Sequence, residues 1–168
     1  MSKELFDIVD RNDQVIGTTD KKTAHELGQL HRVSAVYVFN QAGELFVQVH
    51  GTDGKWDHSV GGHVSKGETY AQAAVREAKE ELGIDQPLEE LATSLMGDEH
   101  PHMQHLFGLY TCIADPSWEF VPNDEVHEIF PMSIEDIRHA MATGPEERFT
   151  RGFRITMDEY VRQKGVDQ

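Results

Sequence analysis

Short apolar runs with a period of two occur along most of the chain and predict β-strands. Residues 33–39 and 104–114 are the two strongest runs, because both are rich in apolar and aromatic residues. Residues 40–43 read Asn-Gln-Ala-Gly and predict a turn that joins the first run to a hairpin partner. The remaining strands are expected at residues 4–17, as a strand pair, and at residues 45–50, 56–64, 91–96 and 129–132.

One long helix is predicted over residues 70–82, which contain neither Gly nor Pro. Thr69 suits the N-cap, and Gln72 three residues later completes a capping box. Gly83 provides the C-terminal stop. At about 100° per residue, one stripe of this helix is apolar and is expected to be buried. The stripe consists of Ala71, Ala74, Val75, Ala78 and Leu82.

Three further segments have weaker helical signals. Residues 20–28 are polar and predict a short helix or a loop, whereas Ser133 can cap a helix that runs to about Ala142. The apolar spacing of Phe149, Phe153 and Met157 predicts a C-terminal helix over residues 147–165.

Strands and helices therefore interleave around one large helix, which predicts an α/β sandwich with a mixed β-sheet. The 168 residues suffice for one domain. We expect a single domain over residues 1–168, with a strand pair and short helix at 1–31, a core at 32–143 and a C-terminal helix at 147–165.

The charge and the cysteine content of the chain limit the classes of function that it can have. The chain has 15 Lys plus Arg against 30 Asp plus Glu, a formal net charge of −15. This balance argues against a nucleic-acid duplex as partner, since a phosphate backbone requires a basic surface. Cys112 is the single cysteine, which excludes an internal disulfide and fits a reducing compartment. With no apolar leader or membrane-length stretch, we expect a cytoplasmic protein with no membrane partner.

The most informative motif covers residues 61–84. Five residues separate Gly62 from Glu68, and seven separate Glu68 from the run Arg76-Glu77-Ala78-Lys79-Glu80-Glu81-Leu82-Gly83-Ile84. Glu77 is three residues from Glu80 and four from Glu81, so these carboxylates are neighbours on the helix surface. They are expected on a flank away from the apolar stripe. Carboxylate clusters of this kind are usually only solvated. Oxygen-only ligands on a rigid helix suit Mg²⁺ or Mn²⁺, which usually also engages phosphates, and the spacing of Glu68, Arg76 and the Gly61-Gly62 pair favours such a site because it resembles the motif of a known hydrolase family.

This pattern resembles the Nudix box, the signature of hydrolases that cleave nucleoside diphosphates linked to another group. Ala78 is the one departure, because the family usually has a bulkier aliphatic residue there. The resemblance implies the Nudix-type α/β/α sandwich. It also implies metal-dependent hydrolysis of a phosphoanhydride bond, with a small-molecule diphosphate as substrate. A homodimer is common among relatives, and the residues do not decide whether one forms here.

The metal ligands can be assigned within the motif. Glu77 and Glu81 are the first choice, Glu80 is expected to join a second ion, and the Gly61 carbonyl can complete the shell because Gly allows close approach. The bound ion would neutralise phosphate charge and activate water.

Three further residues are expected to act in catalysis. Arg76 can pair with a box glutamate and fix its rotamer, although an ordinary surface ion pair is the alternative. Glu68 can help to position the attacking water. Among Asp124, Glu125 and Glu128, Glu125 is the candidate general base, with a merely solvated loop as the alternative.

Outside the box, the chain is similar to the branch of the family related to type 1 isopentenyl diphosphate isomerase. The similarity lies in residues 4–17, in His25 with His31-Arg32, and in residues 55–63. Isomerisation of an isoprenoid diphosphate is therefore the alternative function. Against it, Gly61 stands where that isomerase has a cysteine, residues 102–105 lack its glutamates, and the hydrolase box is complete. A ligand-binding module without turnover is a third hypothesis.

The similarity also draws attention to histidines. His25, His31 and His63 align with metal-binding positions of the isomerase, and His102 or His105 could join them in a second metal site. The alternative is that these are structural or surface histidines in a chain that has ten. We favour that alternative, because the partner glutamates are missing.

Overall fold

The computed structural model describes residues 4–97 and 104–166. The strands are β1 (Leu5–Val9), β2 (Val15–Asp20), β3 (His31–Phe39), β4 (Leu45–Val49), β5 (Trp56–Asp57), β6 (Val60–His63), β7 (Glu89–Met96), β8 (His105–Ile113) and β9 (Ile129–Met132). The helices are α1 (Lys21–Glu26), α2 (Tyr70–Leu82), α3 (Ile134–Thr143), the 3₁₀ turn η1 (Glu146–Arg148) and α4 (Arg151–Lys164).

Strand β3 organises the sheet. It pairs in parallel with β8 along its whole length and antiparallel with β1, β4 and β6, so the nine-stranded sheet is mixed. Its side chains alternate between two buried faces, because successive residues of a strand point to opposite sides. Val36 and Val38 belong to one core cluster, whereas Tyr37 and Phe39 belong to the other.

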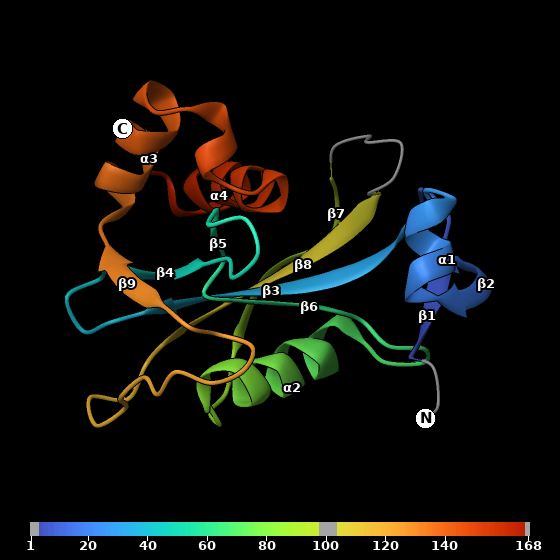
Figure 1. Cartoon of the computed structure of the whole chain (residues 1–168), viewed down its shortest axis with the longest axis horizontal. Helices are drawn as coiled ribbons and strands as arrows, with labels where there is room; N and C mark the ends of the chain where they lie inside the picture. Colours follow the sequence, from blue (N-terminus) through green and yellow to red (C-terminus); the bar gives the residue numbers. More distant parts are fainter. Residues whose placement is uncertain (1–3, 98–103, 167–168) are drawn as a thin grey trace.

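Helices cover both faces of this sheet. Figure 1 shows α2 on one side and α3 with α4 on the other, while α1 lies beside β1 and β2 at one end. The core under α2 includes Ala74, Ala78 and Leu82, and the core under α4 includes Phe153 and Met157. The expected α/β sandwich with a mixed sheet is confirmed.

Helix α2 has the predicted ends but presents a different face to the core. Thr69 and Gln72 form the capping box, and Gly83 closes the helix in the left-handed conformation at φ 65°. Ala71 is exposed, and Val75 is 45% exposed, so the predicted stripe was wrong at these two positions.

The cause is Tyr70. Its carbonyl accepts a hydrogen bond from Ser34 Oγ at 2.7 Å, and its ring lies against Gly108, where a Cβ would overlap it. Burying this large side chain turns the helix by about one residue. The buried face then includes Tyr70, Ala73, Ala74, Glu77, Ala78, Glu81 and Leu82.

The other helices differ from prediction only at their ends. Residues 21–26 are helical, and Ser133 caps α3 through the Asp136 amide. The C-terminal helix begins at Arg151 rather than at residue 147, because Thr150 is its N-cap and η1 occupies residues 146–148. In the described part of the chain, no helix is both long and apolar enough to cross a membrane.

Candidate active site

The close contact between α2 and β6 positions Glu77. A Cβ added to Gly62 would overlap the Glu77 carboxylate, so only glycine allows the helix side chain to lie over the strand at this point. Glu77 is 9% exposed, and Glu81 one turn later is 8% exposed. The prediction that both lie on a flank away from the core was therefore wrong. Turning of α2 toward Tyr70 brings them inward, against the glycine pair.

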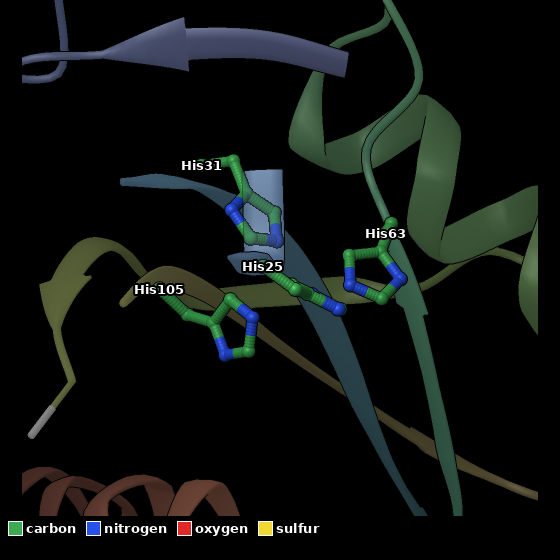
Figure 2. Close-up of side chains that lie close together, drawn as sticks. All are labelled: His25, His31, His63 and His105. Atoms are coloured by element: carbon green, nitrogen blue, oxygen red, sulfur yellow. The ribbon is translucent and has the colours of Figure 1, made fainter. Parts of the chain in front are cut away.

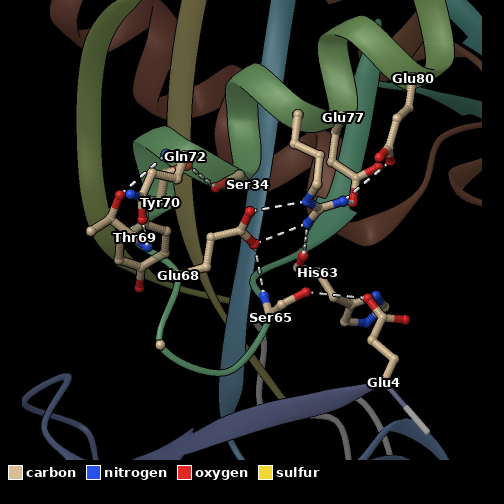
Figure 3. Close-up of polar contacts among 12 residues, drawn as sticks. Glu4, Ser34, His63, Ser65, Glu68, Thr69, Tyr70, Gln72, Glu77 and Glu80 are labelled. Carbon is tan, nitrogen blue, oxygen red and sulfur yellow. Dashed lines mark hydrogen bonds and ion pairs between the residues drawn. The ribbon is translucent and has the colours of Figure 1, made fainter. Parts of the chain in front are cut away.

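Arg76 holds several groups of the motif together (Figure 3). Its Nε and Nη2 atoms each donate to one oxygen of Glu68 at 2.9 Å, and Nη1 donates to Glu77 at 2.6 Å. Nη2 also donates to the His63 carbonyl at 3.1 Å. A planar guanidinium makes such paired bonds in a fixed geometry. The hydrogen bonds to Glu68 raise the pKa of Arg76 above its ordinary value, so this cation is permanent.

Glu68 is the counterpart of this arginine. Its second oxygen also accepts from the Ser65 amide at 2.9 Å, so the loop before α2 is tied to the helix. Burial alone would raise the pKa of Glu68, but the hydrogen bonds from Arg76 and Ser65 outweigh it and the pKa is lowered. Both carboxylate oxygens are thus engaged, which favours a positioning role for Glu68 over direct handling of water.

Glu81 lies deeper than the rest of the motif. Gln48 Nε2 on β4 donates to its carboxylate at 3.0 Å, and the Gly61 amide forms a further hydrogen bond with it. Burial, with the nearby charge of Glu77 as a further contribution, raises the pKa of Glu81 to about 8. Without a cation, this carboxyl group therefore holds its proton at neutral pH.

A distant loop completes the cluster. One carboxylate oxygen each from Glu77, Glu81 and Glu125 lie within 4.8 Å of one another. Asn123 places the loop, because its Nδ2 donates to the Glu81 carbonyl at 2.8 Å. Its Oδ1 accepts from the amides of Glu125 and Val126, each at 2.9 Å.

The other two assigned ligands have different positions. Glu80 is 50% exposed and reaches Arg76 at 3.3 Å, outside the group of three converging carboxylates. Gly61 adjoins the cluster through the hydrogen bond of its amide with Glu81.

The charge of the cluster fits a divalent cation. Burial raises the pKa of Glu77, and Glu80 and Glu125 add to the effect, although Arg76 opposes it. Without an ion, the proton on Glu81 limits the repulsion within this cluster, and an ion with oxygen ligands would allow all three groups to be charged. The donor set contains only oxygen, which suits Mg²⁺ or Mn²⁺.

A cavity of about 390 Å³ lies on the opposite face of β6. Gly61 lines it and also forms the hydrogen bond with Glu81, so the cavity adjoins the carboxylates at this residue. Lys21 and Lys55 contribute cationic groups to its wall. Asp53 and Asp57 line the same cavity, and the Asp53 carboxylate lies 3.6 Å from the Lys55 ammonium, so the wall carries charges of both signs.

Four histidines lie close together (Figure 2), and three of them, His25, His63 and His105, line this cavity. The sheet register places three of them on one face, because His31 pairs with His105 and His63 pairs with Val33, two residues from His31. His25 covers them from α1. The ring centroids lie between 4.6 Å and 6.0 Å apart. His102 lies outside the described residues.

In each of these four rings, one nitrogen atom is buried and has no hydrogen-bond partner among the described residues. This atom is Nε2 in His25, His31, His63 and His105 alike. Burial, together with the neighbouring histidines, lowers the pKa of His63 to about 2 and that of His105 to about 3, so both rings are neutral at physiological pH.

Sequence reasoning missed two residues of the site. Gln48 lies in an ordinary strand sequence that carries no signal, because its role depends on the pairing of β4. Asn123 stands before Asp124 and Glu125, and an Asn that starts such a polar loop often bonds to amides two residues later. That pattern could have identified it.

Comparison with known sequences places these features in a family. The model of the NUDIX domain matches residues 29–153. The isopentenyl-diphosphate Δ-isomerase of Pectobacterium atrosepticum is 32% identical over 157 residues, which cover 89% of this chain and 87% of that protein. An uncharacterized Nudix hydrolase of Pseudomonas aeruginosa, PA4841, is 41% identical over 86 residues, or 48% of this chain and 51% of that protein.

Solved structures show the same fold. The crystal structure of DR0079 from Deinococcus radiodurans matches with a TM-score of 0.74 and 25% identity, and covers 92% of this chain and 97% of that one. The NUDIX domain of Shewanella oneidensis NrtR, complexed with ADP ribose, matches with a TM-score of 0.60 and 12% identity over 79% of this chain and 87% of that one.

Proposed function

The chain belongs to the Nudix family, and we propose that it is a metal-dependent hydrolase that cleaves a phosphoanhydride bond in an organic diphosphate. This proposal depends on one observation. The carboxylates of Glu77, Glu81 and Glu125 converge beside Gly62 of strand β6. Burial raises the pKa of both Glu77 and Glu81, and a divalent cation with a phosphate group would instead favour their charged forms.

Glu77 and Glu81 would hold the ion, Mg²⁺ or Mn²⁺, from adjacent turns of α2. When bound, such an ion supplies charge neutralisation for the phosphate oxygens and lowers the pKa of water. Glu80 and the Gly61 carbonyl stay proposed as further ligands, Glu80 for a second ion.

The remaining groups orient the reaction. Arg76 fixes the Glu77 rotamer through its 2.6 Å hydrogen bond, and Glu68 holds Arg76 in place. Glu125 is the proposed general base. It would accept the proton of a water molecule whose oxygen bonds to phosphorus as the bridging P–O bond breaks.

The cavity supports a small anionic substrate. Lys21 would attract its phosphates, and Gly61 lets the backbone approach them closely. The NrtR domain shows that this fold accommodates a nucleoside diphosphate derivative. The net charge of −15 argues against a nucleic-acid duplex as the substrate.

The isomerase relatives favour isomerisation of an isoprenoid diphosphate as the second candidate. The residues present here oppose it. The resemblance places the isomerase cysteine at Gly61, and Cys112 is part of β8, where burial raises the pKa of its thiol to about 11. A thiol of this kind is a poor proton donor or nucleophile at neutral pH.

The test is a panel of nucleotides, nucleotide sugars, dinucleotides and isopentenyl diphosphate, each incubated with Mg²⁺ or Mn²⁺. Released phosphate or pyrophosphate is measured by a coupled assay, and isomer formation by product analysis. Glu81→Gln is the control for a contaminating hydrolase. Metal-dependent hydrolysis by the wild type that is lost in Glu81→Gln is the expected result. Isomer formation without hydrolysis would replace the proposal with the second candidate, and Mg²⁺-dependent binding without turnover would support a binding module.

A further inference from the structure

The wall of the cavity contains a carboxylate that the proposed hydrolysis does not use. Asp57 of β5 lines the cavity, and its side chain is 23% exposed. Three groups approach its Oδ1 atom: the His58 amide at 2.8 Å, His58 Nδ1 at 2.6 Å and Thr150 Oγ1 at 2.7 Å. No residue in the described part of the chain donates a hydrogen bond to the other oxygen, Oδ2, and this atom is not buried.

The neighbours of Asp57 are already engaged with the fold. His58 Nε2 lies 2.8 Å from Oγ1 of Thr156, a buried residue of α4. Thr150 is the N-cap of α4, and its Oγ1 accepts from the Phe153 amide at 3.2 Å while it donates to Asp57. The Oδ1 atom of Asp57 therefore fastens β5 to α4, and Oδ2 is left for a molecule in the cavity.

The charge of Asp57 limits what that molecule can be. Burial alone would raise the pKa of Asp57, but the interaction with His58 and the hydrogen bonds from His58 and Thr150 outweigh it, and the pKa is lowered. An ionised carboxylate accepts hydrogen bonds and donates none. A hydrocarbon chain against Oδ2 would displace water without replacing its hydrogen bonds, which is costly.

The same cavity also has apolar surface. Val33 of β3 and Phe107 of β8 line it, and both strands are central in the sheet. The Phe107 ring packs against α4 at Gly152, where a Cβ would come within 2.8 Å of its Cζ atom. A wall with a fixed aromatic ring and a charged acceptor suits an organic group that has an apolar face and hydrogen-bond donors at its edge.

From this arrangement we infer that Asp57 is a specificity-determining residue, whose Oδ2 atom accepts a hydrogen bond from an O–H or N–H group in the organic part of the diphosphate. This inference rests on the proposed function, because it takes the cavity as the substrate site. It names the organic part as a nucleoside, with donors on its sugar or its base, and it excludes an isoprenoid chain, which has none. Sites that bind a substrate group through a hydrogen bond discriminate strongly against analogues that lack the group.

The test measures binding of probes that cannot be cleaved, so its outcome does not depend on turnover. The probes are the α,β-methylene analogues of adenosine diphosphate, uridine diphosphate and isopentenyl diphosphate, each titrated calorimetrically in the presence of Mg²⁺. We expect the wild type to bind at least one nucleoside probe more than about 10-fold more tightly than the isopentenyl probe, since a hydrogen bond to a charged group is worth at least this much. A 2′,3′-dideoxy form of that probe assigns the contact to the sugar if the preference is lost, and to the base if it persists.

Asp57→Asn tests the residue itself. The amide keeps the shape of the side chain and an acceptor oxygen for His58 and Thr150, but it places an NH₂ group at the position of Oδ2. This variant should weaken binding of the preferred nucleoside probe about 10- to 100-fold, the range for loss of a hydrogen bond to a charged group. Binding of the isopentenyl probe should not weaken. A purely structural role of Asp57 would instead weaken both probes in the same proportion.

Asp53→Asn is the matched control, because Asp53 lines the same cavity and the substitution changes the net charge equally. Its carboxylate is already engaged, with Oδ1 3.0 Å from His50 Nδ1 and Oδ2 3.6 Å from the Lys55 ammonium. We expect this variant to retain the wild-type preference between the probes. Circular dichroism checks that both variants fold, and the wild-type comparison holds even if one does not.

Three results would overturn the inference. They are a wild type that binds neither nucleoside probe more tightly than the isopentenyl probe, equal weakening of both kinds of probe in Asp57→Asn, and the same change of preference in Asp53→Asn. Selective nucleoside binding by a protein that cleaves nothing would contradict the proposed hydrolysis but support the role of Asp57. Hydrolysis without this selectivity would do the reverse.

Discussion

The carboxylate cluster and the histidine cluster lie on opposite faces of one short strand. Gly62 of β6 faces α2 and contacts Glu77, whereas the next residue, His63, points to the other side and meets His25 and His31. The first cluster offers charged oxygen atoms and the second neutral nitrogen atoms. Two clusters of different chemistry therefore lie on the two faces of one strand, because the pleat separates them.

The two clusters also differ in how they are assembled. Glu77 and Glu81 come from one helix, and a single loop residue, Glu125, joins them. The histidines come from α1, β3, β6 and β8. We expect the carboxylate cluster to be sensitive to side chains that orient α2 and the loop, and the histidine cluster to be sensitive to the sheet register.

The largest expected effect concerns the box glutamates. Glu77→Gln and Glu81→Gln should each lower kcat by roughly 100- to 1,000-fold, the range found when a group that stabilises transition-state charge is removed. The fold should survive, because Gln has the same shape and Glu81 already holds a proton at neutral pH. Steady-state kinetics with Mg²⁺ would measure the change. Glu80→Gln, which alters the exposed carboxylate, should cost less than about 10-fold. Equal losses in all three variants would contradict the separate position of Glu80.

The second largest effect is expected at β6, the strand that both clusters share. Gly62→Ala should lower kcat by about 100-fold, because the new Cβ would occupy the position of the Glu77 carboxylate. The matched control is Gly61→Ala, whose Cβ would lie in ordinary contact, 3.7 Å from His58 Nδ1. We expect it to cost less than about 10-fold. If Gly61→Ala were the more damaging variant, the contact between Glu77 and Gly62 would not matter for turnover.

A smaller effect is expected at Asn123. Asn123→Ala removes the hydrogen bonds that place Glu125 beside α2, and we expect kcat to fall about 10-fold with little change in KM. Asn123→Asp keeps Oδ1 as acceptor for the two amides and should recover part of the loss. Unchanged kcat in Asn123→Ala would show that the loop does not need this anchor, and would weaken the assignment of Glu125.

The smallest expected effect is on stability. In metal-free protein, the two clusters should change the free energy of unfolding in opposite directions as the pH changes. Burial lowers the pKa of His63 and His105, so below the ordinary histidine pKa of about 6.5 the unfolded chain binds more protons than the folded one. The free energy of unfolding should therefore fall as the pH decreases from 7 to 5, by at most about 1.4 kcal/mol per pH unit for each histidine.

Glu81 should act in the opposite direction. Its folded pKa of about 8 is higher than the unfolded value of about 4.3, so between these values the folded chain binds more protons and stability falls as the pH increases. Urea unfolding of chelated protein at several pH values would measure both slopes. His63→Gln should flatten the first slope, and Glu81→Gln should flatten the second. If His63→Gln altered neither slope, the buried histidines would not be the acid-sensitive groups.

By itself, the sequence determined the elements whose interactions are local. The capping box of Thr69 and Gln72, the stop at Gly83 and the spacing of the box glutamates all involve residues within a few positions of one another, so a pattern predicts them. The alternation along residues 33–39 likewise predicted the strand that became the centre of the sheet, because its side chains pack on both faces.

Only the tertiary structure decided how these elements face one another. Packing of Tyr70 on Ser34 and Gly108 rotated α2 and buried Glu77 and Glu81, which the helical stripe had placed outside. Pairing of β3 with β6 and β8 brought together the histidines, and the bond from Asn123 to the Glu81 carbonyl brought the loop of Glu125 to α2. These outcomes depend on strand register and on contacts between segments far apart in the chain, and no local pattern encodes either.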